Sequence, residues 1–321
     1  MRTSITVLLF LVIAAPALGD GLPIATSADG VSHGVTRYVA LDSSRGTVVA
    51  AIRRDGAKVT AWRTLRAHAA IPAAAVDGSP TGLSADGRTL VLIRPRVRFP
   101  QPHTELTILD TARFALRRHV RLRGDYSLDA ISPDGRTLFL IHYTSRVDPA
   151  KYEVRAWDGR LLPQPIVDPH ERAENMRGYP MSRAVSADGR WAYTLYDGGG
   201  DTPFIHALDT TGRTARCIDM PLLRGRDLWA LRLRARGKHL VVTTHGAPIA
   251  LVNTRTFRAG GFSPLPPPHA EAHHGGVPWW LVAVVVTVLV GAVVLYGSTR
   301  PAQITASQAS SSSIDSASRA T

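Results

Sequence analysis

A five-residue turn motif recurs along the chain and constrains the fold more than any other feature of the sequence. Its three strong copies, each followed at once by an apolar run, are Ser84-Ala85-Asp86-Gly87-Arg88, Ser132-Pro133-Asp134-Gly135-Arg136 and Ser186-Ala187-Asp188-Gly189-Arg190. Asp-Gly between apolar runs supplies the positive φ of a tight hairpin, because glycine has no Cβ to clash. The motif therefore predicts β-hairpins at these three places.

Two weaker copies extend the series. Ser44-Arg45-Gly46 precedes an apolar run at residues 47–52, and Arg236-Gly237-Lys238 precedes one at residues 239–243. The five central glycines follow one another at intervals of 41, 48, 54 and 48 residues. Self-similarity at this period indicates a repeat architecture.

A second motif lies downstream in four of the units, where an apolar run ends in Asp or Asn, residues that close a turn with their own side chain. It occupies residues 106–111, 154–159, 205–210 and 249–254. A further short strand follows at residues 118–122, 165–168 and 215–220. Each unit is therefore expected to hold four short strands, A to D.

Four-stranded units at this spacing predict an all-β fold, a β-propeller of four-stranded blades. Five repeat units are visible, and a sixth is possible if one unit is unrecognised or residues 22–38 belong to another blade. An open β-solenoid is the other arrangement. The Ser-Pro-Asp-Gly-Arg hairpin and its apolar strand resemble the WD40-like repeats of bacterial propellers, as in the TolB C-terminal domain and YncE-like proteins. The resemblance covers roughly residues 35–262 and implies a bacterial propeller.

The two ends of the chain predict export and anchoring. Arg2, an apolar run and the small residues before position 20 are typical of a signal peptide at residues 1–19. Residues 277–297 form an uncharged apolar run, with tryptophans at its start, that is long enough to span a bilayer as a transmembrane helix.

These segments predict a single-pass type I protein of the cell membrane with an extracytoplasmic ectodomain. The propeller is assigned to residues 20–263, a Pro/His-rich linker to residues 264–276 and a disordered cytoplasmic tail to residues 298–321.

The charge of the chain is strongly basic and almost entirely due to arginine. The formal net charge is +13, and among the basic residues the only lysines are Lys58, Lys151 and Lys238. Arginine suits bidentate recognition of phosphate or carboxylate, although genomic base composition explains the bias equally well. Cys217 is the only cysteine, so an internal disulfide is excluded.

The binding site is expected on one face of the propeller. In a four-stranded blade the A–B and C–D turns share one face, while the B–C loops and D–A links share the other. The long and varied connections belong to the second face, and functional residues collect on loops held by a rigid scaffold. The candidate ligand-binding or partner-binding residues are Arg94, Arg96, Arg98, His142, Tyr143, Arg146, Tyr196, Asp197 and His245.

Two groups among these candidates carry specific expectations. The arginines at positions 94, 96 and 98 alternate along an extended segment, so they are expected to point the same way and engage an anion; a solvated loop is the alternative. His142 and Tyr196 each follow the turn Asp of their blade by eight residues. They are expected at the rim of the central channel, or else as packing at strand ends.

The sequence carries none of the common catalytic or nucleotide-binding motifs. Cys217 lies in an apolar strand pattern and is expected to be buried and inert. No catalytic residue, cofactor or metal site is predicted. The interpretation is a binding propeller that recognises a protein or an anionic envelope polymer, contacts the membrane through a single helix and binds no nucleic acid. The alternative is a hydrolase acting on cell-envelope substrates.

Overall fold

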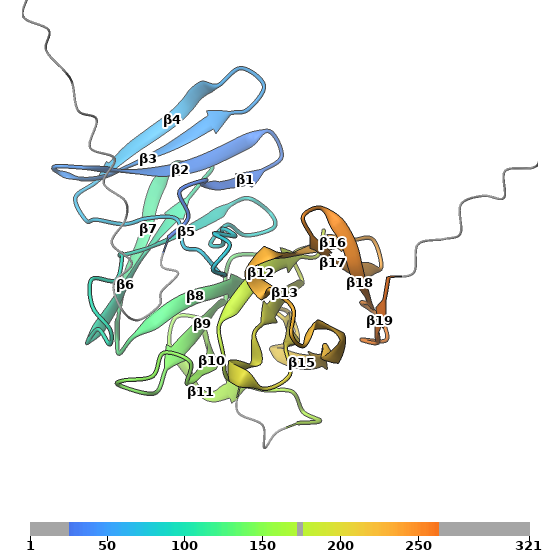
Figure 1. Ribbon diagram of the computed structural model, residues 1–321. Helices are drawn as coiled ribbons and strands as arrows, with labels where there is room; N and C mark the ends of the chain where they lie inside the picture. Colours follow the sequence, from blue (N-terminus) through green and yellow to red (C-terminus); the bar gives the residue numbers. More distant parts are fainter. Residues whose placement is uncertain (1–25, 172–175, 263–321) are drawn as a thin grey trace, which may run out of the picture. The chain divides into compact units, whose positions relative to one another are not determined.

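The strands of residues 26–171 and 176–262, which a computed structural model describes, are arranged in five antiparallel sheets (Figure 1). Each sheet is a meander in which consecutive strands pair. We call the sheets blades 1 to 5 in chain order. This arrangement confirms the expected all-β class and five repeat units.

Four blades contain four strands each. Blade 1 contains β1 (Val31–His33), β2 (Thr36–Ser43), β3 (Gly46–Arg53) and β4 (Lys58–Leu65). Blade 3 contains β8 (Tyr126–Ile131), β9 (Leu138–Tyr143), β10 (Tyr152–Trp157) and β11 (Leu161–Ile166). Blade 4 contains β12 (Pro180–Val185), β13 (Trp191–Tyr196), β14 (Phe204–Asp209) and β15 (Thr214–Asp219). Blade 5 contains β16 (Leu231–Arg236), β17 (His239–Thr244), β18 (Ala247–Asn253) and β19 (Ala259–Gly261).

Blade 2 has three strands, β5 (Thr89–Ile93), β6 (His103–Asp110) and β7 (Ala115–Arg123). Its first strand is reduced to a short bridge, in which Leu83 pairs with Leu90 and Val91 N donates to Gly82 O at 2.7 Å. Three short 3-10 turns, η1 (Gly198–Gly200), η2 (Pro221–Leu223) and η3 (Leu228–Ala230), lie in the connections around blade 4.

The three strong motif copies form tight hairpin turns, as predicted, and each is the A–B turn of its blade. In the second copy, Ser132 Oγ donates to Asp134 Oδ1 at 2.7 Å, and the same oxygen accepts from Arg136 N at 3.1 Å. Gly135 has a φ of 71°, and a Cβ at this glycine would lie 2.3 Å from the Oγ1 atom of Thr89 in blade 2. The glycine therefore provides both the turn conformation and a close contact between blades.

Ser44-Arg45-Gly46, predicted as a weaker copy of this motif, does form a hairpin, but at a different place in its blade. This turn joins β2 to β3 and is the B–C turn, while Gly34, between β1 and β2, occupies the A–B position. Serine next to glycine in a short hairpin resembled the motif, but it lacks the aspartate that accepts the hydrogen bonds of the true copies.

The C–D turns share a backbone signature. A residue other than glycine adopts a φ of 50° to 55° one or two residues before the D strand in four blades, namely Ala57, Phe114, Arg213 and Phe257. In blades 2, 4 and 5 the Asp or Asn that ends the C strand accepts backbone N–H groups of the turn. These contacts confirm the predicted role of Asp110, Asp209 and Asn253.

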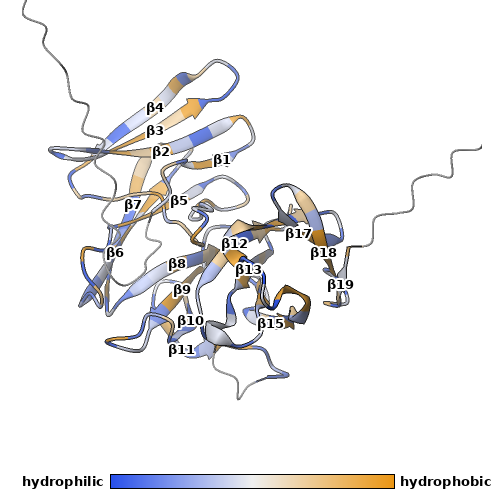
Figure 2. Ribbon diagram, viewed as in Figure 1, coloured by the Kyte–Doolittle hydropathy of each residue, from blue (hydrophilic) through white to orange (hydrophobic). Residues whose placement is uncertain are grey.

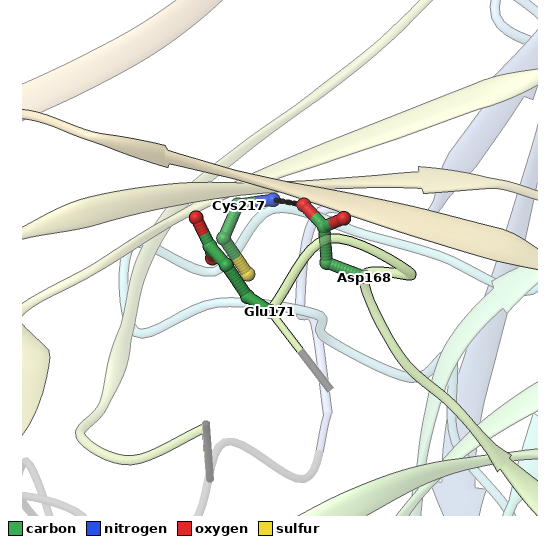
Figure 3. Close-up of side chains that lie close together, drawn as sticks. All are labelled: Asp168, Glu171 and Cys217. Carbon is green, nitrogen blue, oxygen red and sulfur yellow. Dashed lines mark hydrogen bonds between the residues drawn. The ribbon is translucent and has the colours of Figure 1, made fainter. Parts of the chain in front are cut away.

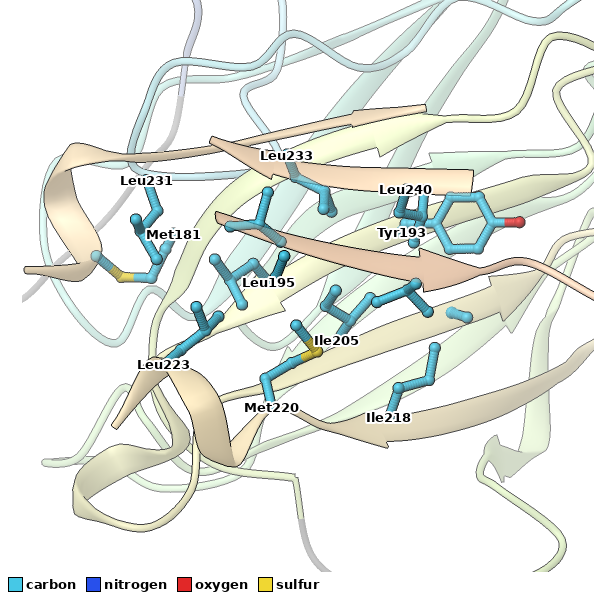
Figure 4. Packing of buried hydrophobic residues seen from close by; sticks show 14 residues of the cluster. Met181, Tyr193, Leu195, Ile205, Ile218, Met220, Leu223, Leu231, Leu233 and Leu240 are labelled. Carbon is cyan, nitrogen blue, oxygen red and sulfur yellow. The ribbon is translucent and has the colours of Figure 1, made fainter. Parts of the chain in front are cut away.

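The core consists of four apolar clusters, each formed between two consecutive blades. Between blades 4 and 5, Leu231, Leu233 and Leu240 face Met181 and Leu195 (Figure 4). Hydrophobic stretches are interspersed with hydrophilic ones along the strands (Figure 2). Burial between sheets, at about 25 cal/mol per Å² of apolar surface, is the main source of stability in a domain that holds no disulfide.

The connector between blades 1 and 2, residues 66–82, packs against three other blades. Ala70 pairs with Ile93 of blade 2, Thr81 Oγ1 donates to Asp129 O of blade 3 at 3.2 Å, and Val76 N donates to Pro180 O of blade 4 at 2.8 Å. The side chains at positions 69, 71, 73, 74 and 75 are all buried. Small apolar residues let this segment lie close to the inner strands.

The predicted signal peptide, linker, transmembrane helix and tail all lie outside the described residues. Within residues 26–171 and 176–262, no helix has the length and apolar character required to cross a bilayer.

Candidate functional site

Each blade is a meander, so alternate connections leave from the same side, which we call the loop face. It carries the B–C loops and the D–A links, whereas the A–B and C–D turns lie on the opposite turn face. Three hollows lie at the loop face, and each is lined by its connections together with the adjoining strand ends. The predicted candidate residues all belong to this face or to the strand ends beside it.

The three arginines of the B–C loop of blade 2 do not point the same way, so this expectation is wrong. The Arg96 side chain is only 4% exposed; its Nη2 lies 2.6 Å from Asp125 Oδ1 and 3.1 Å from Ser127 Oγ. Its guanidinium also lies over the Tyr143 ring, 4.7 Å from the centroid. Arg94 and Arg98 remain exposed. Arg96 therefore fixes the loop, and its side chain is almost entirely withdrawn from solvent.

His142 and Tyr143 end β9 and are held by their neighbours. The His142 ring stacks on Tyr126, with centroids 4.6 Å apart, and its Nδ1 lies 3.1 Å from Glu153 Oε1. Tyr143 OH lies 3.1 Å from Ser127 Oγ. Both side chains are half-buried, so each could present only part of its surface to a ligand.

Tyr196 is buried and does not form an exposed rim. Its ring lies 5.9 Å from that of Tyr152, whose hydroxyl donates to Gly178 O at 3.0 Å. Burial raises the pKa of both phenols well above the usual value. The two rings help to line a cavity of about 30 Å³, closed on one side by Ala73 and Ala74 of the connector. This volume is enough for about two water molecules, so the alternative of strand-end packing describes Tyr196.

The last three candidates differ in their contacts: hydrogen bonds hold Asp197, whereas Arg146 and His245 are exposed. Asp197 Oδ1 accepts from Tyr179 N at 2.7 Å and from Gly199 N at 2.9 Å, so the carboxylate holds the glycine-rich loop. Arg146 and His245 are exposed. The binding roles of all nine residues stay predictions.

The largest of the three hollows is a cleft of about 640 Å³ between blades 3 and 4. The ends of β10 and β11, the link after β11, the B–C loop of blade 4 and the ends of β14 and β15 form its walls. Its volume is in the range of small-molecule sites. None of the nine predicted candidate residues lines this cleft.

The lining of this cleft is acidic, although the chain as a whole is strongly basic. Its five carboxylates are Glu153, Asp168, Glu171, Asp201 and Asp219. Arg177 is the one arginine or lysine in the described lining, and its Nη1 lies 3.5 Å from Asp201 Oδ2. Arg155 Nη1 lies 2.8 Å from Glu153 Oε1 and Arg216 Nε lies 3.8 Å from Asp168 Oδ2, so these ion pairs offset part of the negative charge. The remaining excess of carboxylates favours a cation over an anion.

Asp168 is the most strongly held of these carboxylates. Burial raises its pKa, but donation from His170 N at 2.8 Å and Cys217 N at 2.9 Å more than offsets this, so the pKa of Asp168 is lowered. Arg216 Nε, 3.8 Å from Oδ2, acts in the same direction. Asp168 is therefore an ionised group in a fixed orientation.

His206 lines the same cleft from β14 and is 1% exposed. Neither ring nitrogen has a hydrogen-bond partner among the described residues. Burial lowers the pKa of His206 to about 4, so the imidazole is neutral at physiological pH. A buried imidazole with both nitrogens unsatisfied calls for an explanation.

A further basic surface, which the candidate residues covered only in part, lies at the loop-face end of blade 2. The antiparallel register places Arg123 opposite His103 and Arg121 opposite Glu105, while Arg94 Nη1 lies 3.3 Å from Glu105 Oε1. We call Arg94, Arg98, Arg121 and Arg123 the basic corner. The alternation of arginine along β7 was the sequence signal for it.

Comparisons with known proteins give structural neighbours only. No protein-family model and no curated protein matches the sequence. TolB from Acinetobacter baumannii is similar at 14% identity and a TM-score of 0.33, over 71% of this chain and 57% of that chain. The Swd1 β-propeller domain of Myceliophteria thermophila is similar at 12% identity and a TM-score of 0.42, over 74% and 70%. Hydrazine synthase of Kuenenia stuttgartiensis is similar at 17% identity and a TM-score of 0.40, over 78% and 69%.

Five consecutive meander sheets joined in series, with their repeated hairpins, define the class of this protein as an all-β fold built from the blades of a β-propeller.

Proposed function

We propose that the chain is a membrane-anchored recognition propeller that captures a protein partner through its loop face. The observation that carries the proposal is the position of the three hollows, all lined from that face. The A–B turns of the opposite face, by contrast, are closed by their own serine and aspartate hydrogen bonds. Residues 277–297 supply the anchor, and residues 20–263 lie outside the cytoplasm.

The charges of the loop face support a protein partner over a uniform polymer. The basic corner of blade 2 and the acidic cleft between blades 3 and 4 lie on the same face with opposite sign. A protein surface can complement both signs, whereas an anionic envelope polymer would be attracted by the first and repelled by the second. The anionic part of the partner is expected at the basic corner.

The test compares two charge-reversal variants of the full-length protein, purified in a mild detergent. The first changes Arg94, Arg98 and Arg123 on the loop face to Glu. The control changes Arg88, Arg136 and Arg255 on the turn face to Glu, which alters the net charge by the same amount. Each variant is immobilised and exposed to solubilised cell envelope, and partners are identified and quantified by mass spectrometry.

The proposal expects a partner that the wild type and the turn-face control capture equally and that the loop-face variant loses. The midpoint temperatures of thermal unfolding should differ little between the two variants, because all six arginines are exposed. Capture should weaken as salt rises, because exposed charges are screened within about 10 Å at 0.1 M. Equal capture by the two variants would refute the loop face as the binding surface. Binding of polyglutamate without any protein partner would favour an anionic polymer.

The alternative of a hydrolase acting on cell-envelope substrates has no specific support in the described residues. Asp168 and Glu171 bring carboxylate oxygens within 4.8 Å of each other. The pKa of Asp168 is lowered, which suits a base or nucleophile but not the general acid that the same reaction requires.

A further inference from the structure

The smallest of the three hollows is a cavity lined by blades 3 and 4 and by the connector. Its buried walls come from β8, β9, β10 and β13, together with Ala73 and Ala74. Tyr143, Pro149 and Tyr179 line the same cavity but are only half-buried. They belong to the loop-face end of β9, to the B–C loop of blade 3 and to the link before β12. The cavity is therefore reached from the loop face.

Asp129 is the only charged residue in the described lining of this cavity. It lies at a β-bulge of β8, where the register with β9 shifts between Leu128 and Ala130, and bulges of this kind re-aim a side chain. Its Oδ1 pairs with Arg183 Nη2, whereas its Oδ2 has no hydrogen-bond partner among the described residues. Because the side chain is only 3% exposed, an unpaired carboxylate oxygen at this place is costly unless a bound group donates to it.

The other buried aspartates of the described residues differ from Asp129 in this respect. They are Asp125, Asp168 and Asp209, and hydrogen bonds reach both carboxylate oxygens of each. Figure 3 shows one of these contacts, the donation from Cys217 N to Asp168. Among the four buried aspartates, Asp129 alone keeps an oxygen that can accept a hydrogen bond from a ligand.

Three tyrosine rings line the cavity together with Asp129. The ring centroids of Tyr143 and Tyr196 lie 6.3 Å and 5.9 Å from that of Tyr152. Burial raises the pKa of Tyr152 and Tyr196 well above the usual value, so both phenols are neutral. The face of a neutral aromatic ring attracts a cation, and a carboxylate oxygen accepts the N–H groups of that cation. The lining therefore suits a positively charged group that carries hydrogen-bond donors.

We propose that this cavity, which we call the amine pocket, binds a primary ammonium group that donates to Asp129 Oδ2 and packs against the tyrosine rings. Its volume of about 30 Å³ accommodates about two water-sized groups, namely the ammonium and the methylene that carries it. The planar guanidinium of arginine is larger. The expected source is a lysine side chain of the partner, and this choice of source rests on the proposed function.

Two arginines near the amine pocket limit its affinity. Arg183 pairs with the other oxygen of Asp129, which offsets part of the carboxylate charge. The Arg96 guanidinium lies 4.7 Å from the centroid of the Tyr143 ring, so this ring already holds a cation. Oδ2 and the two buried rings remain for a ligand. If Oδ2 serves only water, an alkylammonium ion will not bind here.

The test measures the binding of ethylammonium to the full-length protein in a mild detergent by saturation-transfer NMR. Ethanol, a neutral molecule of the same size, is the matched control ligand, and sodium chloride keeps the ionic strength constant. The proposal expects saturable ethylammonium binding, no tighter than about 1 mM because so small a ligand gains little free energy. Ethanol should bind at least about tenfold more weakly, since it lacks the charge. Absence of ethylammonium binding, or equal binding of ethanol, would overturn the proposal.

Variants locate the bound ethylammonium. Asp129→Asn should weaken binding at least about tenfold, because the amide carries no charge. Ala74→Leu places a larger side chain in the cavity wall without removing the carboxylate, and it should abolish binding. Asp209→Asn is the matched control, because Asp209 is a buried, arginine-paired carboxylate outside this cavity, and it should bind as the wild type does. Thermal unfolding identifies any variant that has lost its fold. Binding that survives in folded Asp129→Asn and Ala74→Leu proteins would refute the amine pocket.

Competition separates the amine pocket from its expected source. Once a partner has been captured through the loop face, saturating ethylammonium should release it, and the same concentration of sodium chloride should release much less. Equal release by the two salts, together with saturable ethylammonium binding, would overturn the partner lysine and assign the pocket to a free amine. If the full-length protein captures no partner, the proposed function fails, while the ethylammonium titration still decides whether the amine pocket exists.

Discussion

The Arg96 guanidinium and the Asp125 carboxylate form an ion pair that is almost completely buried. Arg96 Nε and Nη2 lie 2.9 Å and 2.6 Å from Asp125 Oδ1, and the two side chains are 4% and 1% exposed. Gln101 N donates to the other carboxylate oxygen at 2.9 Å. The pair thus ties the B–C loop of blade 2 to the link that enters blade 3.

Removing Arg96 should cost much more stability than removing its neighbour Arg98. Arg96→Ala leaves the Asp125 carboxylate buried without its cation, which costs about 3–5 kcal/mol in the free energy of unfolding. Arg98→Ala changes an exposed side chain and should stay within about 0.5 kcal/mol. Chemical denaturation followed by tryptophan fluorescence measures both. Equal losses would show that the buried pair contributes no special stability.

The glycines of two A–B turns separate backbone strain from contact between blades. Gly135 and Gly237 have φ values of 71° and 56°. A Cβ on Gly135 would meet Thr89, whereas a Cβ on Gly237 would meet no atom within 4 Å. Alanine at Gly237 should cost about 1–2 kcal/mol from the left-handed conformation alone. Alanine at Gly135 should cost about 1–3 kcal/mol more, from overpacking.

Denaturation midpoints of the two alanine variants check this difference. A Gly135→Ala protein as stable as Gly237→Ala would mean that blades 2 and 3 separate freely at this turn.

The fold was largely predictable because hairpin chemistry is local. The turn at residues 132–136 needs only its own serine, aspartate and glycine, so its sequence reveals it. Blade 1 was misassigned because a bare Ser-Arg-Gly turn can close either a B–C or an A–B hairpin. The position of the connector depends on how its alanines pack against strands far along the chain. No local sequence pattern predicts this packing.

The candidate site was much less predictable. Arg96 looks like its neighbours in sequence, and only Asp125, 29 residues away, makes it a buried structural group. Asp168 lies 49 residues from Cys217, so no local sequence pattern predicts the hydrogen bond between them. The pairing of His206 with Cys217 was readable from the hairpin around Asp209. The burial of the His206 imidazole could not be predicted, because it is set by the packing of two blades.

Ser182 should be a sensitive point for the connector. Its Oγ donates to Asp77 Oδ2 at 2.6 Å and accepts from Leu233 N at 2.9 Å, which links the connector to blades 4 and 5. Ser182→Ala leaves a buried backbone N–H and the Asp77 carboxylate without this partner, at about 1–3 kcal/mol. The exposed Ser32 of β1 is the control, and Ser32→Ala should change stability by less than about 0.5 kcal/mol.

The unfolding free energies of these two serine variants decide whether the connector is fastened here. A loss confined to Ser182→Ala supports the link. Loss of the same size in both variants would contradict it.

The chain should lose stability in acid, because several turn carboxylates hold protons less tightly when folded. Burial raises the pKa of Asp209, but the Arg190 hydrogen bond and donation from the amides of Gly212 and Thr211 more than offset this and lower it. Hydrogen bonds from serine likewise lower the pKa values of Asp134 and Asp188. Unfolded aspartate titrates at about 3.9.

The stabilisation from these carboxylates is therefore fully present above about pH 4 and is lost as the pH falls through the lower folded-state pKa values. The free energy of unfolding should fall with decreasing pH in this range. Asp209→Asn removes one of the contributing groups and should give a shallower fall, whatever its effect at neutral pH. Denaturation curves at a series of acidic pH values compare the two slopes. A variant as steep as the wild type would show that Asp209 does not contribute to the acid sensitivity.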